Sequence, residues 1–74
     1  MVKAKLYCQT FPRQFGKYRV SVLDLRGEEI TGVLVAPEKQ IEVSVIEDHG
    51  DKALVLLPFG MSKEIAWIKS NNLD

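Results

Sequence analysis

Apolar and polar residues alternate along most of this chain, and turn residues interrupt the alternation at short intervals. Residues 18–22 read Tyr-Arg-Val-Ser-Val and residues 41–45 read Ile-Glu-Val-Ser-Val. A period of two places successive side chains on opposite faces of a β-strand. Glycine, proline and aspartate end most of these runs, because these residues suit turns. The pattern predicts an all-β fold with strands at residues 2–11, 18–25, 30–36, 41–47 and 53–57.

Residues 62–70 leave two interpretations open. They can form a further strand, with Ile65 and Trp67 on one face, or a short helix capped by Ser62. Tryptophan and isoleucine are common in strands, and no capping box precedes the segment, so we favour the strand. Five to six short strands gain most by closing into a barrel, since closure removes exposed edges. We therefore expect one strongly bent antiparallel sheet that closes into a small barrel.

Three further segments carry local structural signals. Gly32 lies inside a predicted strand, which indicates a bulge or the close approach of another backbone segment. Residues 53–57 are apolar without alternation, which predicts a central strand covered on both faces. Residues 36–40 are expected to form a turn, because Pro37 fixes φ at a value that turns use.

The length of 74 residues predicts a single domain, residues 1–74, with a thin hydrophobic core. Cys8 is the only cysteine, so no disulfide can form within the chain, and we expect it to be a small buried apolar residue. His49 is the only histidine, and its neighbours Asp48 and Gly50 indicate an exposed turn. These residues predict no metal site and no cofactor.

Acidic and basic residues balance over the whole chain, but they are unevenly distributed along it. Residues 1–37 carry six basic and three acidic side chains, whereas residues 38–74 carry four basic and seven acidic ones. A strong nonspecific nucleic-acid binder usually has a net positive charge, which this chain lacks. No apolar run has the length of a membrane span or a signal peptide. We expect a cytoplasmic protein without membrane contact.

Residues 20–36 combine a strand, a turn glycine at Gly27 and a second strand that contains Gly32. This arrangement resembles the first motif of Sm-like proteins, in which two such glycines help to build a bent barrel. It is also similar to Src-homology-3-like barrels. Phe59-Gly60 stands where the second Sm-like motif has a basic residue before glycine. The resemblance mainly implies a small barrel fold. RNA binding and ring assembly, the functions of that family, are a weaker implication.

The basic, aromatic-rich N-terminal region is the candidate site for ligand binding. Basic groups can hold phosphates while aromatic rings stack on bases. The candidate ligand-binding residues are Phe11, Arg13, Phe15, Lys17 and Arg19. For the aromatic side chains Phe11, Phe15 and Tyr18 we nevertheless favour a place in the core or in a small cluster under the loop, and for Trp67 a place in the core, because a short chain needs its large side chains there.

The sequence contains no paired carboxylates of catalytic character, no phosphate-binding glycine loop and no nucleophile beside a base. We therefore expect a protein that is not an enzyme. The interpretation we favour is a small binding or assembly module that contacts a protein partner or a second copy of itself. The alternative is a small barrel that binds RNA or single-stranded DNA through the basic, aromatic-rich region.

Overall fold

Seven strands and two 3-10 helices make up residues 2–35 and 39–74, the residues that the computed structural model describes. The strands are β1 (Val2–Tyr7), β2 (Gln9–Pro12), β3 (Lys17–Leu23), β4 (Glu29–Val35), β5 (Gln40–Asp48), β6 (Lys52–Leu56) and β7 (Ile65–Lys69). The 3-10 helices are η1 (Gln14–Gly16) and η2 (Ser70–Asn72). The all-β fold predicted from the alternation is thereby confirmed.

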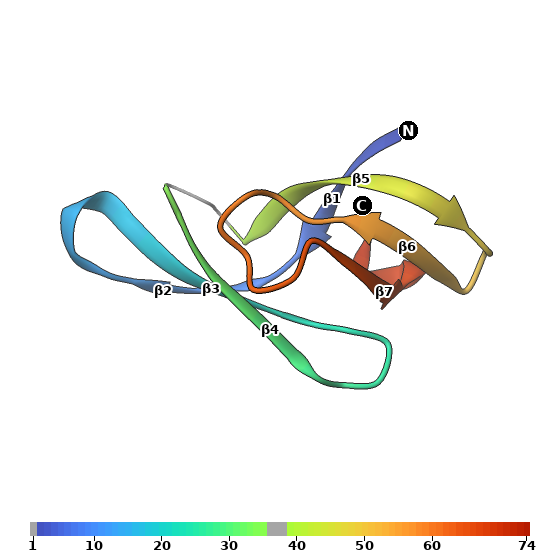
Figure 1. Cartoon of the computed structure of the whole chain (residues 1–74), viewed down its shortest axis with the longest axis horizontal. Helices are drawn as coiled ribbons and strands as arrows, with labels where there is room; N and C mark the ends of the chain where they lie inside the picture. Colours follow the sequence, from blue (N-terminus) through green and yellow to red (C-terminus); the bar gives the residue numbers. More distant parts are fainter. Residues whose placement is uncertain (1, 36–38) are drawn as a thin grey trace.

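The strands form two antiparallel sheets (Figure 1). One has four strands in the order β1-β5-β6-β7, and the other has three in the order β2-β3-β4. Within the described part of the chain neither sheet closes on itself, so the predicted closure into a barrel is not confirmed.

The expected first strand, residues 2–11, is in fact two strands that belong to different sheets. β1 pairs with β5 from Val2 opposite Val45, whereas β2 pairs with β3 from Gln9 opposite Ser21. Cys8 lies between them, and its N–H donates to the carbonyl oxygen of Lys39 at 2.9 Å. The alternation continues through this point, so nothing local marks the change of partner, and the strand count rises above the expected five to six.

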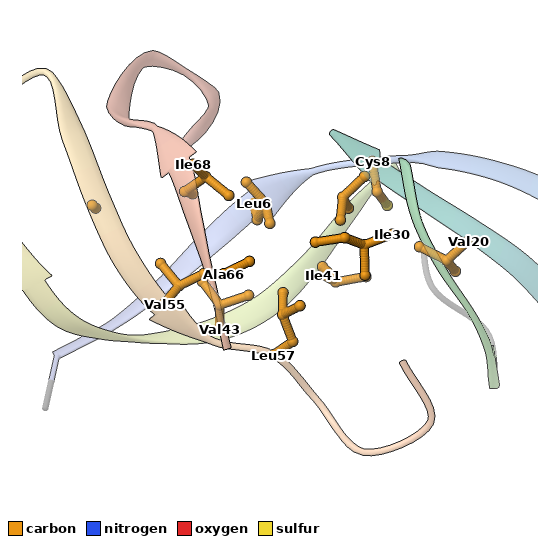
Figure 2. Close-up of a cluster of buried hydrophobic side chains, with 12 residues drawn as sticks. Leu6, Cys8, Val20, Ile30, Ile41, Val43, Val55, Leu57, Ala66 and Ile68 are labelled. Carbon is orange, nitrogen blue, oxygen red and sulfur yellow. The ribbon is translucent and has the colours of Figure 1, made fainter. Parts of the chain in front are cut away.

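The hydrophobic core is aliphatic apart from one thiol, and strands of both sheets contribute to it (Figure 2). Its buried members are Leu6, Cys8, Val20, Val22, Ile30, Ile41, Val43, Ala53, Val55, Leu57, Ala66 and Ile68. All six aromatic residues lie outside this set, and four of them are exposed: Tyr7, Phe11, Phe15 and Phe59. The expectation that the aromatic residues fill the core is therefore wrong.

Trp67 and Ile65 share a face of β7, as predicted, but it is the outer face. Ala66 and Ile68 point to the core instead, because they pair with the buried Val55 and Ala53 of β6. The strand interpretation of this segment is confirmed, and the core role of Trp67 is wrong. β6 lies inside its sheet as predicted, but its outer face is not covered, since Leu56 is 36% exposed.

Gly32 is where another backbone segment approaches β4. A Cβ at Gly32 would lie 2.5 Å from the carbonyl oxygen of Gly60 and 2.7 Å from Cα of Met61, and Gly32 forms a β-bridge with Met61. The close approach predicted from this glycine is confirmed. The turn expected at residues 36–40 lies largely outside the described residues, since 36–38 are not among them.

Candidate functional site

The three-stranded sheet has one face toward the core and one toward solvent. Val20 and Val22 of β3 are buried, so the alternate residues Lys17 and Arg19 point outward. The register then places Phe11 of β2, Arg19 of β3 and Val33 of β4 in one row across this surface. Lys17 and Val35 form the next row.

The outer β2–β4 face is our name for the end of this surface beside the β2–β3 turn, and it consists of seven exposed residues that are either basic or apolar. They are Phe11, Arg13, Phe15, Lys17, Arg19, Val33 and Val35. All five residues predicted as ligand-binding belong to this set, so the structure brings them together at one end of the sheet. Sequence reasoning missed Val33 and Val35, although the alternation in residues 30–36 already separates them from the buried Ile30.

Phe15 occupies the turn between β2 and β3 in a conformation that is unusual for its residue type. Its φ of 62° lies in the left-handed region, and Gly16 follows with a φ of 70°. The Arg13 N–H donates to the Lys17 carbonyl oxygen at 2.8 Å and closes the turn. The Phe15 side chain is 92% exposed, so it gains almost no burial in return for the backbone strain.

The basic groups of this face are only partly neutralised. Arg19 Nη2 lies 3.5 Å from Glu29 Oε1, and both side chains are about half exposed. Within residues 2–35 and 39–74, no carboxylate lies within salt-bridge distance of Arg13 or Lys17. Arg13, Gln14, Phe15, Lys17 and Val33 line an open hollow of about 470 Å³. The surface therefore combines unpaired positive charge with exposed apolar area.

A second, smaller set of apolar side chains lies on the outer face of β6 and β7. Leu54 pairs with Trp67, and Leu56 pairs with Ile65. Lys52 Nζ lies 5.2 Å from the Trp67 ring centroid, and the His49 ring packs against the same tryptophan at 5.4 Å. Trp67 is thus partly covered by neighbours from its own chain. His49 is exposed in a turn, as predicted.

Two titratable groups outside this face have shifted pKa values. Burial raises the pKa of the Cys8 thiol, and Cys8 is a buried core residue as predicted. A hydrogen bond from Lys3, together with the charges of Lys3 and Lys5, lowers the pKa of the Glu42 carboxyl. Neither arrangement places a nucleophile beside a general base.

Among the described residues, no three His, Cys, Asp or Glu side chains cluster in a way that could hold a metal ion. The same residues include no helix with the length and apolar character needed to cross a membrane.

Comparison of the chain with protein-family models, curated proteins and solved structures gave no significant match. The similarity to Sm-like and Src-homology-3-like barrels stays a prediction.

Proposed function

We propose that this chain is a non-catalytic binding module whose outer β2–β4 face receives an acidic, partly apolar segment of a partner protein. One observation carries the proposal. Arg13 and Lys17, which have no salt-bridge partner among residues 2–35 and 39–74, flank a phenylalanine that is 92% exposed in a strained turn. The aromatic ring is covered by the fold over less than a tenth of its surface, and both the charge and the ring suit a partner with carboxylates and apolar side chains.

The aliphatic residues of the same face favour a protein partner over a nucleic acid. Val33 and Val35 are 39% and 76% exposed, and branched aliphatic side chains offer no flat surface on which a base could stack. The balanced net charge points the same way, because nucleic-acid affinity rests mainly on positive charge.

Single-stranded RNA or DNA is a second candidate ligand for this face. It is favoured by Phe11, which lies beside Arg19 on an open sheet surface, where a base could stack while the guanidinium binds a phosphate. The two candidates use the same residues, so one titration separates them.

A barrel-like closure of the fold also belongs to this proposal. Main-chain hydrogen bonds connect β7 and the segment before it with β4 and the β3–β4 turn: Ser62 N–H donates to Thr31 O of β4, and Leu25 N–H of the turn donates to Trp67 O, each at 2.7 Å. Such links support a Src-homology-3-like arrangement, which holds the outer β2–β4 face rigid. A cytoplasmic location is the compartment we propose for the module.

A labelled peptide that alternates glutamate with leucine tests the proposal through fluorescence anisotropy at low salt. We expect binding to the wild type, and about tenfold weaker binding to Phe15→Ala and to the double variant Arg13→Glu/Lys17→Glu. Phe59→Ala is the matched control, because Phe59 is equally exposed in a loop outside this face.

A peptide with lysine in place of glutamate controls for charge. Equal binding of both peptides, or no binding by the wild type, contradicts the proposal. Binding of oligothymidylate without binding of the acidic peptide selects the nucleic-acid candidate instead.

A further inference from the structure

The charge asymmetry along the sequence becomes a charge asymmetry in space. The molecule is elongated, with principal extents of 38 × 23 × 18 Å. Figure 1 shows the turn between β2 and β3 at one end of the long axis and the turn between β5 and β6 at the other. Arg13 and Lys17 lie at the first end, whereas Glu47, Asp48 and Asp51 lie at the second. The paired residues Lys52 and Lys69 also lie at the second end, and His49 Nε2 is 3.6 Å from Glu47 Oε1, so the three carboxylates exceed the two lysines by one negative charge.

Each end also carries exposed apolar area beside its charges. Phe15 and Val35 accompany the basic end, at 92% and 76% exposure. At the acidic end, Ile46 is 40% exposed at a break in the β5–β6 register, directly before Glu47. The two ends are therefore complementary in charge and alike in apolar character, a combination that suits a protein–protein contact.

We propose that the partner of the outer β2–β4 face is the acidic β5–β6 hairpin of a second copy of this chain. This inference rests on the proposed function and names its partner. In the contact, Arg13 and Lys17 of one copy face Glu47 and Asp51 of the next, and Phe15 packs beside Ile46.

The contact is head to tail, because it joins different surfaces of the two copies. Such a contact leaves one free basic end and one free acidic end, so further copies add to both ends. Since the two surfaces lie at opposite ends of the long axis, successive copies are spaced near the 38 Å length of one copy, in a ring where the rotation between copies closes and in an open chain where it does not.

Two charge-reversal variants test the contact through complementation. Arg13→Glu/Lys17→Glu alters only the basic end, and Glu47→Lys/Asp51→Lys alters only the acidic end. Asp48 is left unchanged because its Oδ1 accepts a hydrogen bond from the Gly50 N–H within the turn. Circular dichroism establishes that each variant folds before its association is measured.

Sedimentation velocity and light scattering then report mass at about 20 mM and about 500 mM salt, where screening is weak and strong respectively. We expect the wild type to exceed twice its monomer mass of 8.4 kDa at low salt and high micromolar concentration, and to dissociate at high salt. Each variant alone stays monomeric, and an equimolar mixture regains at least the dimer mass, because it restores one native pair of ends.

A monomeric wild type, growth that stops at a dimer, or a mixture that stays monomeric overturns the inference. Its failure is distinguishable from failure of the proposed function. A monomeric wild type that still binds the glutamate–leucine peptide retains the binding face and loses only the second copy as partner. A wild-type protein that neither self-associates nor binds the peptide contradicts both the proposed function and this inference.

Discussion

Replacing Phe15 with asparagine should leave the fold as stable as before, or make it more stable, while binding of the acidic peptide weakens about tenfold. A non-glycine residue in the left-handed region carries roughly 1 kcal/mol of strain, which asparagine tolerates better than phenylalanine. Phe15 is 92% exposed, so about a tenth of a side chain that buries roughly 200 Å² is covered. At about 25 cal/mol per Å², this burial contributes roughly 0.5 kcal/mol. The free energy of unfolding of Phe15→Asn should therefore equal that of the wild type or exceed it by up to about 1 kcal/mol.

Urea unfolding followed by circular dichroism measures this effect. With a slope of about 1 kcal/mol per molar urea, the midpoint should stay in place or rise by up to about 1 M. The same variant should bind the acidic peptide about tenfold more weakly than the wild type, and Phe59→Ala should bind it as tightly as the wild type. A loss of more than about 1 kcal/mol would show that Phe15 packs against the fold, and the reasoning from its exposure would then be wrong.

Three further predictions concern positions outside the binding face. Gly32→Ala should destabilise the fold by about 2 kcal/mol or more in urea unfolding, because the added methyl group meets the Gly60–Met61 backbone, and an unchanged midpoint would refute the close approach. The Cys8 thiol should react with a thiol reagent only at the rate of unfolding, and fast labelling of the native protein would contradict its burial. Because burial raises the pKa of this thiol, its contribution to stability is lost as pH rises above the thiol's ordinary pKa. An NMR titration should place the pKa of the Glu42 carboxyl below its ordinary value, so the stabilising effect of this carboxylate disappears as pH falls through the lowered pKa. Lys3→Ala should raise the pKa of Glu42, and an unaltered pKa in this variant would exclude the Lys3 contact.

Alternation predicted most strands because it is a local signal that each segment carries by itself. Residues 18–22 and 41–45 lie within β3 and β5, and the turn at Gly27 separates β3 from β4. The close backbone approach at Gly32 could also be predicted from the sequence, since a glycine inside a strand often marks such a contact.

Pairing between distant strands carries no such local signal. β1 and β2 form one uninterrupted pattern, yet β5 pairs with the first half and β3 with the second. The sequence therefore predicts the extended conformation of residues 2–11 but not the change of sheet at Cys8.

The orientation of a strand is equally ambiguous when both of its faces are apolar. In β7, Ile65 and Trp67 alternate with Ala66 and Ile68, and only pairing with the buried residues of β6 decides which pair faces the core. Large aromatic side chains suggested the wrong face. The candidate site was easier to predict, because Arg13, Lys17 and Arg19 must stay near solvent wherever the strands pack.

Amide chemical-shift mapping decides whether the outer β2–β4 face is the surface that binds the partner. A ¹⁵N-labelled sample is titrated at low salt with the glutamate–leucine peptide. We expect the largest shifts at Phe11, Arg13, Phe15, Lys17, Arg19 and Val33. Shifts centred instead on Leu54, Ile65 and Trp67, or no shifts at saturating peptide, would contradict the proposed function.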